Sequence, residues 1–304
     1  MTDVAPLDSA LHRSAVGSRA THARATPTTA VGVAPVGTRG RSQSPRWRIG
    51  GALDLRWKIG LGACGVAVVV GAWAIAAASL GDGGGALLPT PAATWHALIH
   101  LASTGALRRD LMASSQRIGI GYGLSVAIGI VVGIGVGALP AIEAFLEAPV
   151  GFLRYIPASA LTPVFLLWLG IGESPKIWLI VIGTVFFNIL MIADAARGVP
   201  KELVDAAATL GASRWTTIRR VVLRHSVPGI VDAARVNLAA AWLMLVVSEL
   251  LAADSGLAFE VVRAQRFRAV DTMFALLLVF GAIGLFSDLG LRALRGRLAP
   301  WARS

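Results

Sequence analysis

Long apolar runs separated by short polar stretches set the pattern of this chain. Six runs stand out, at residues 59–80, 118–142, 155–172, 177–193, 229–253 and 272–291. Each is close to the length of about 20 residues that a helix needs to cross the hydrocarbon core of a bilayer. The pattern therefore predicts an all-α membrane protein with six transmembrane helices. A further short helix, at residues 89–107, is expected at the membrane interface, with Trp95 as its anchor.

One polar stretch, residues 200–228, interrupts this pattern between the fourth and fifth runs. Two short helices fit it. The first, over about residues 200–210, ends at Gly211, a residue suited to the left-handed turn after a helix. The second begins at Ser213, a residue type favoured at N-caps, and Pro228 is expected to start a new helix. Such a helix–glycine–helix unit is typical of a docking element for a cytoplasmic partner; an amphipathic loop on the membrane surface is the alternative.

Composition supports the membrane assignment. Of the 304 residues, 55% are hydrophobic and only 15% are charged, and the mean hydropathy is +0.69. The net charge of +11 raises the question of nucleic-acid binding, but the basic residues are scattered between apolar runs. Basic cytoplasmic parts of a membrane protein explain the charge, so no nucleic-acid partner is predicted. Residues 1–55 are predicted to form a disordered basic cytoplasmic tail, with an organelle-targeting peptide as the alternative, and residues 56–300 form the transmembrane domain.

The Lys and Arg residues also predict the orientation of the chain. With the N-terminus inside, six spans place both tails and residues 200–228 on one side, which then holds 19 of the 28 Lys and Arg residues, against seven on the other side. Cytoplasmic loops carry the excess of these residues in membrane proteins. Both termini and the 200–228 segment are therefore predicted to be cytoplasmic.

Residue patterns for catalysis or cofactor binding do not occur in the sequence. It contains no phosphate-binding loop of the G-x-x-x-x-G-K-[ST] form, and Cys64 is its one cysteine. His96 and His100 share a helical face, but no acid or third ligand lies near them in the sequence. The sequence predicts no catalytic residue, no cofactor and no metal site.

Polar residues inside the apolar runs are the candidates for a transport path, because such residues are costly in a membrane. Each candidate also has a structural interpretation. The Arg154 side chain could extend to the membrane interface, and Glu249 could form a structural ion pair. The uncharged residues could form interhelical hydrogen bonds. Asp232 and Arg235 lie three residues apart and are expected to pair on one helical face. Asn237 is a further polar residue of the fifth run. The candidates for the path are Arg154, Ser159, Thr162, Asn188 and Glu249.

Small residues recur at every fourth position of the second run. On a helix they form one ridge, which predicts close packing against a neighbouring helix; lining of a pore is the alternative. The ridge consists of Gly121, Ser125, Gly129, Gly133 and Gly137.

The 200–228 segment also carries a family motif. Asp205-Ala206-Ala207, followed by Gly211 and then by Val221-Val222-Leu223, resembles the EAA loop of ABC-importer permeases. Asp205 stands where that motif has Glu, which keeps the charge on a shorter side chain. Arg224 stands where the motif has Pro, and the nearest proline is Pro228, which leaves the exit geometry of the loop open.

The resemblance extends over about residues 58–300, including the stretches Arg154–Glu173 and Ser248–Phe267, and is to permeases of the nitrate/sulfonate/taurine/bicarbonate import group. It implies a type I, MetI-like fold in a bacterial inner membrane. It also implies a pair of permease subunits, expected to be a homodimer surrounded by membrane lipid, with cytoplasmic ABC ATPase subunits and an extracytoplasmic substrate-binding protein. ATP hydrolysis is then expected in a separate chain.

The resemblance further implies that the EAA-like loop contacts the ATPase. The expected coupling residues are Asp205, Ala206, Ala207, Gly211, Trp215 and Ile218. The function expected is that of a transmembrane permease subunit that forms the path for a small anion such as nitrate, sulfonate, taurine or bicarbonate. A stand-alone channel or secondary transporter, and a membrane-anchored basic adaptor, are the alternatives.

Overall fold

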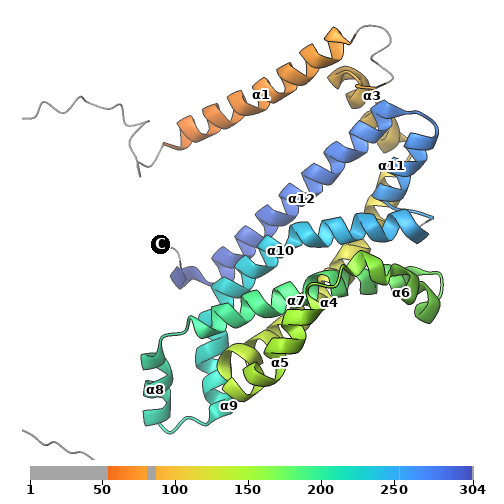
Figure 1. Cartoon of the computed structure of the whole chain (residues 1–304). Helices are drawn as coiled ribbons and strands as arrows, with labels where there is room; N and C mark the ends of the chain where they lie inside the picture. Colours follow the sequence, from red (N-terminus) through yellow and green to blue (C-terminus); the bar gives the residue numbers. More distant parts are fainter. Residues whose placement is uncertain (1–53, 81–86, 253, 303–304) are drawn as a thin grey trace, which may run out of the picture. The chain divides into compact units, whose positions relative to one another are not determined.

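A computed structural model describes residues 54–80, 87–252 and 254–302, and every regular element in these ranges is helical (Figure 1). The chain divides into two units, residues 1–59 and 60–304. Of the first unit, only residues 54–59 are described, as the start of helix α1, so the predicted tail at 1–55 lies almost entirely outside the described residues. All packing described below lies within the second unit.

The helices follow one another in the order that the apolar runs predict, with short helices between them. Within the described ranges, five helices are long and apolar enough to cross a membrane, or six if one bent pair counts as a span. The elements are α1 (Leu55–Ser79), α3 (Pro91–Ser103), α4 (Ala106–Ala138), α5 (Pro140–Leu153), η2 (Ala158–Leu161), α6 (Thr162–Leu169), α7 (Glu173–Arg197), α8 (Lys201–Thr209), α9 (Arg214–Thr217), η3 (Ile218–Val222), α10 (Leu223–Ala252), α11 (Leu257–Arg266), α12 (Val270–Leu298) and η4 (Pro300–Ala302).

Helices α4 and α7 pack most closely, through the ridge of small residues. A Cβ atom added at Gly133 would lie 2.8 Å from the Ile189 carbonyl oxygen, and one at Gly137 would lie 2.5 Å from the Ala193 carbonyl oxygen. Side chains at these positions would push the two backbones apart, so the missing Cβ atoms allow the close approach. The predicted packing ridge is confirmed, and it faces α7.

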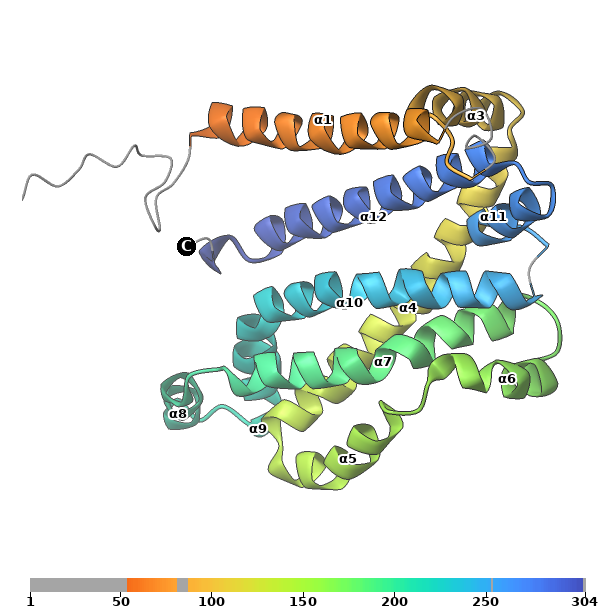
Figure 2. The ribbon, with the colours of Figure 1, turned by 45° about the horizontal axis from the view of Figure 1, so that its top comes forward.

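Helix α10 also packs on α7, and α12 packs on α10 (Figures 1 and 2). Ile192 and Ala233 join α7 to α10 in one buried apolar cluster, and Ile180 and Leu245 join them in another. Many large apolar side chains on the outward faces are exposed, among them Val131, Leu243 and Phe286. Exposed apolar belts of this kind suit contact with lipid.

The second and third spans differ from the prediction. The second begins twelve residues earlier than expected, at Ala106 rather than 118, because Arg108, Arg109 and Arg117 are accommodated within α4. The third is no single helix. Helix α5 and the η2–α6 stretch are bent by 81° at residues 154–157, where Pro157 cannot continue a helix.

Candidate functional site

The segment between α7 and α10 forms a compact helical turn at one end of the second unit, away from α3, α6 and α11 (Figures 1 and 2). Helix α8 ends at Thr209, and Gly211 has a φ of +76°, which is the left-handed conformation predicted for it. Ser213 caps α9, since its hydroxyl accepts a hydrogen bond from the Thr216 N–H at 3.3 Å. The turn and the cap expected from the sequence are confirmed.

The second half of this segment differs from the expectation of a separate short helix. Helix α9 continues through a π-helical turn, η3, into α10 without a break. Pro228 therefore lies inside α10 and does not start a new helix. The prediction for Pro228 was wrong. A proline inside a helix removes one backbone N–H donor, and the long helix α10 tolerates this loss. A change of direction is visible in the first part of α10 (Figure 1).

The surface of this segment offers apolar side chains to a partner. Trp215 is 66% exposed and Leu210 is 86% exposed, and Leu203 on α8 is also exposed. Leu203 and Leu210 were not predicted as contact residues, although their seven-residue spacing places them on one helical face. Ile218, in contrast, is half-buried against the core cluster of α4, α7 and α10.

Three other residues that the sequence predicts for coupling lie on α8. The side chains of Asp205 and Ala206 are exposed, and Ala207 is half-buried. Beside them is a hollow of about 600 Å³ between α8, α9 and the α4–α5 junction. Arg197, Lys201 and Arg214 line this hollow together with apolar residues such as Val204 and Ile218.

Polar residues join α4, α7 and α10 in the middle of the helix bundle. The Asn188 amide donates to the Ser125 hydroxyl at 2.9 Å and accepts from the Asn237 amide at 2.8 Å. The Thr184 hydroxyl lies 2.8 Å from the Ser125 hydroxyl. The Tyr122 hydroxyl donates to the Ala234 carbonyl oxygen at 2.5 Å. The contacts of Asn188 and Asn237 are thus the interhelical hydrogen bonds that were the alternative to a transport path.

The remaining predicted path residues do not gather at one point. Arg154 is exposed, and its guanidinium lies over the Tyr155 ring, 4.7 Å from the centroid. Ser159 is exposed as well. The buried Thr162 hydroxyl donates to the Ser159 carbonyl oxygen at 2.7 Å.

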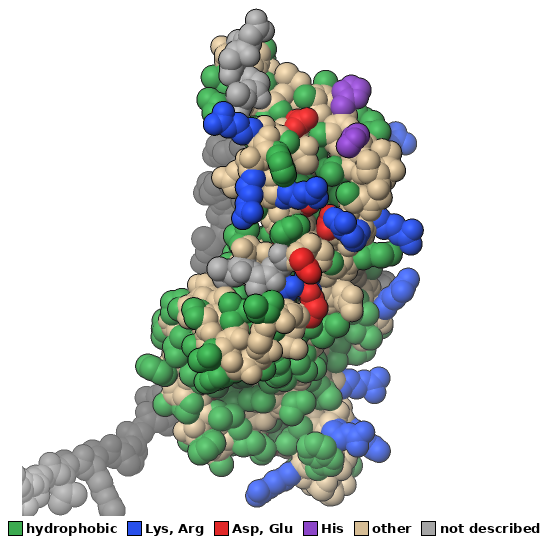
Figure 3. All heavy atoms as spheres, turned by 90° about the vertical axis from the view of Figure 1, so that its right-hand side faces the viewer, with side chains coloured by type: hydrophobic (Ala, Val, Ile, Leu, Met, Phe, Trp, Pro, Cys, Tyr) green, Lys and Arg blue, Asp and Glu red, His purple; other side chains and the backbone are tan. Residues whose placement is uncertain are grey.

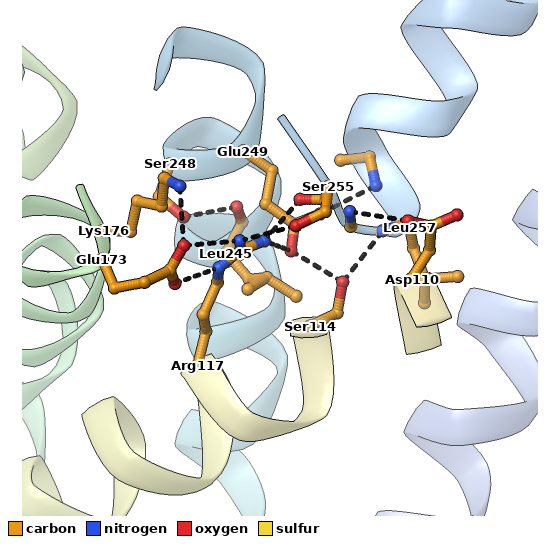
Figure 4. Close-up of polar contacts among 12 residues, drawn as sticks. Asp110, Ser114, Arg117, Glu173, Lys176, Leu245, Ser248, Glu249, Ser255 and Leu257 are labelled. Atoms are coloured by element: carbon orange, nitrogen blue, oxygen red, sulfur yellow. Dashed lines mark hydrogen bonds and ion pairs between the residues drawn. The ribbon is translucent and has the colours of Figure 1, made fainter. Parts of the chain in front are cut away.

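Glu249 belongs to a charged cluster, which we define as Arg117, Glu173, Lys176 and Glu249 (Figure 4). Glu173 and Lys176 lie in the first turn of α7, at the end of that helix opposite α8. Arg117 Nη1 donates to Glu249 Oε1 at 2.8 Å, and both side chains are buried. Arg117 Nε and Nη2 donate to the two carboxylate oxygens of Glu173, at 2.6 and 2.8 Å. Lys176 Nζ donates to Glu173 Oε1 at 2.8 Å.

The turn between α10 and α11 closes over this cluster. The Ala258 N–H donates to Glu249 Oε2 at 2.9 Å, and the Ser114 hydroxyl donates to Glu249 Oε1 at 2.6 Å. The Gly256 N–H donates to the buried Asp110 carboxylate at 3.1 Å. A Cβ atom at Gly256 would overlap the Glu249 carboxylate, so glycine is required at that point of the turn.

Arg117 and Lys176 are among the seven Lys and Arg residues that the sequence prediction counts on the side opposite the cytoplasm, and no function was predicted for them. Both are buried instead. One feature of the sequence could have indicated that Arg117 is buried. It lies three residues after Ser114, in a polar stretch that continues directly into an apolar run. Its partners are 56 and 132 residues away along the chain, so the sequence alone could not supply them.

Asp232 and Arg235 do pair within α10, at 3.4 Å, as the three-residue spacing predicts. Arg235 also binds Asp288 of α12 at 2.9 Å, and Arg295 binds Asp232 at 3.1 Å. These ion pairs join α10 to α12. Among the described residues, no group of three His, Cys, Asp or Glu side chains could hold a metal ion.

Comparisons with known proteins agree with this arrangement. Residues 125–300 match the family described as binding-protein-dependent transport system inner membrane component. A probable ABC transporter permease protein of Brucella melitensis is 35% identical over 243 residues, which cover 80% of this chain and 97% of that protein. The taurine transport system permease protein of Escherichia coli is 34% identical over 220 residues, 70% of this chain and 80% of that protein.

The fold also matches solved structures. A chain of the MetNI methionine ABC transporter, in an inward-facing crystal form, superposes with a TM-score of 0.53 at 20% identity. The match covers 62% of this chain and 95% of that chain. The MetI-like fold expected from the sequence is thereby confirmed.

Proposed function

Because the chain belongs to the family of binding-protein-dependent transport system inner membrane components, we propose that it forms the translocation path for a small anion in an ABC importer. It is a multi-pass inner membrane permease subunit without catalysis of its own. Membership implies an ATPase and a binding protein as partners.

The coupling surface for the ATPase is formed by α8, the Gly211 turn and α9. The observation that carries this proposal is a capped, exposed helical turn that joins two membrane-length helices and presents Leu210 and Trp215 to solvent. A helical turn fixed in this way can transmit a push to α7 and α10, whereas a loose loop would absorb it. Asp205, Ala206 and Ala207 contribute the α8 side of the surface, and Ile218 supports it from the core.

The transported solute is a small anion such as nitrate, sulfonate, taurine or bicarbonate. The relative from Escherichia coli is a taurine permease by name, and taurine carries a sulfonate group. Arg154, Ser159, Thr162 and Glu249 are proposed to lie along the path, at the bend between α5 and α6 and at the charged cluster. We also keep Asn188 in this proposal, although its hydrogen bonds to α4 and α10 favour helix packing.

Two copies of the chain are proposed for each transporter, surrounded by lipid and without a nucleic-acid partner. Both termini and the coupling surface face the cytoplasm, because most Lys and Arg residues then lie on that side. The charged cluster lies at the opposite end of α7 from the coupling surface. The 25 residues of α7 separate them by about 37 Å, at a helical rise of about 1.5 Å per residue.

Site-directed cross-linking tests the coupling surface. In a Cys64→Ser background, Leu210→Cys is expected to cross-link to a cysteine placed in the surface groove of the co-expressed ATPase. Phe267→Cys is the matched control, because Phe267 is 76% exposed at the other end of the unit. Cross-links from Phe267→Cys, or none from Leu210→Cys in a complex that hydrolyses ATP, would refute the assignment of this surface.

A further inference from the structure

Glu173 is much more exposed than Arg117 and Lys176, the two cations that it binds. Its side chain is 54% exposed, whereas those of Arg117 and Lys176 are 3% and 4% exposed. Buried cations are costly unless an anion is paired with them. Here two cations lie inside the protein and one carboxylate covers them from the solvent side. On the face shown in Figure 3, acidic and basic side chains lie next to one another.

Arg117 keeps its place by contacts that do not involve Glu173, whereas the contact of Lys176 is with Glu173 itself. Arg117 Nη1 is bound by Glu249 and by the Ser255 carbonyl oxygen, at 2.8 and 2.7 Å. Glu249 is itself fixed by Ser114 and by the Ala258 N–H. The edge of the guanidinium that faces Glu173 is thus oriented even when that carboxylate moves away.

The charges explain why Glu173 is needed when no other anion is present. Arg117 and Lys176 carry two positive charges, and Glu173 and Glu249 carry two negative charges, so the cluster is neutral. Without the Glu173 carboxylate, one buried positive charge would lack a partner. Such a charge is strongly destabilising unless another anion takes the position.

We propose that Arg117 and Lys176 form a binding site for the transported oxoanion, which Glu173 occupies as an internal substitute in the conformation described here. An arriving oxoanion displaces the Glu173 carboxylate and receives the same three donors, Arg117 Nε, Arg117 Nη2 and Lys176 Nζ. This inference rests on the proposed function, and it places the recognition of the solute at the α11 end of the permease.

The donors define the chemical class of the ligand. A guanidinium edge binds two oxygens of one planar or tetrahedral oxoanion in parallel, and an ammonium group adds a third contact. A sulfonate, a carboxylate, nitrate or bicarbonate supplies oxygens at that spacing. Chloride is a single atom and cannot offer two oxygens to the guanidinium, so it is expected to bind more weakly.

Glu173→Gln tests the displacement. This change removes the competing charge and keeps the size of the side chain. If the open site is populated at about 1–10% in the unmodified chain, the apparent affinity for methanesulfonate rises on the order of 10- to 100-fold in the variant. The measurement is the rise in melting temperature of the purified permease–ATPase complex during a methanesulfonate titration at constant ionic strength.

Glu143→Gln is the matched control. Glu143 of α5 is also a partly exposed carboxylate that binds an arginine, at 2.7 Å. This arginine, Arg197, is the last residue of α7, at the end opposite Glu173. This control is expected to respond to methanesulfonate as the unmodified complex does. The double variant Glu173→Gln, Lys176→Gln is expected to lose the gain. Chloride is expected to stabilise Glu173→Gln less than methanesulfonate does.

A purely structural ion pair predicts another result. Glu173→Gln would then be destabilised, and no anion would restore it; that outcome, or equal responses of Glu173→Gln and Glu143→Gln, overturns the inference. If Glu173→Gln yields too little folded complex, Glu173→Asp carries the test, since its shorter side chain weakens the fork, and a smaller gain in affinity is expected. An unchanged affinity in Glu173→Asp would then overturn the inference.

If the proposed function is wrong, the same preparation gives a different result. No ATPase would co-purify, and no nucleotide would be hydrolysed. A complex that hydrolyses ATP but shows no difference in anion response between variants would refute the oxoanion site alone.

Discussion

Replacement of Gly133 by alanine tests the packing that holds α4 against α7. The added Cβ would lie 2.8 Å from the Ile189 carbonyl oxygen and 3.0 Å from the Ile192 Cβ. One of these neighbours is backbone, which cannot move aside without displacing the helix. Gly123→Ala is the matched control, because a Cβ at Gly123 meets no atom within 4 Å.

The magnitude follows from two opposing effects. Alanine is favoured over glycine in a helix by about 0.8–1.0 kcal/mol, and this gain applies to both variants. An extra methyl group in a well-packed core costs about 1–3 kcal/mol, and only Gly133→Ala carries this cost. The helix-propensity gain cancels in the comparison. Gly133→Ala is therefore expected to be about 1–3 kcal/mol less stable than Gly123→Ala, or about 5- to 150-fold in the unfolding equilibrium constant.

The assay is reversible unfolding of the detergent-solubilised chain by SDS, followed by circular dichroism. Gly133→Ala is expected to unfold at a lower SDS fraction than the unmodified chain, and Gly123→Ala at the same fraction or a higher one. Equal stabilities of the two variants would show that α4 and α7 do not approach as closely as described here.

Three further substitutions test the buried ion pair, the coupling surface and the role of Asn188. Glu249→Ala leaves Arg117 without one buried partner, so a loss of about 3–5 kcal/mol in stability is expected from SDS unfolding; an unchanged transition would contradict the buried pair. Trp215→Ala removes an exposed side chain, so the unfolding transition should stay unchanged while less ATPase co-purifies; equal co-purification would exclude Trp215 from the coupling surface. Asn188→Ala loses two interhelical hydrogen bonds at about 0.6 kcal/mol each. Lower stability with an unchanged KM for uptake is expected if Asn188 only packs helices, and a raised KM would place it on the path.

Local features of the fold were predictable because neighbouring residues determine them. The Gly211 turn follows from the conformational freedom of glycine, and the Ser213 cap follows from a hydroxyl placed before a helix. The small-residue ridge of α4 was readable from its four-residue period alone. The helix that packs against this ridge was not predictable, because the period indicates a close contact but does not identify the neighbouring helix.

The charged cluster could not be predicted, because it depends on contacts between distant parts of the chain. Arg117, Glu173 and Glu249 come from three helices and meet only after α4, α7 and α10 have packed. The sequence indicated that Glu249 is costly in a membrane, but it did not identify Arg117 as its partner. The third span was predicted at 155–172, interrupted by Pro157 and Pro163, but its pairing with α5 through an 81° bend was not predicted, because the relative direction of two helices depends on how they pack.

Uptake of radiolabelled taurine into proteoliposomes tests the central claim most directly. The liposomes contain this chain with its ATPase, and the binding protein is added outside. Uptake is expected to require ATP and to be lost in Gly211→Asp, because a side chain at a φ of +76° disturbs the coupling turn while the membrane helices still insert. Concentrative uptake without the ATPase, or normal uptake by a correctly inserted Gly211→Asp variant, would contradict the account.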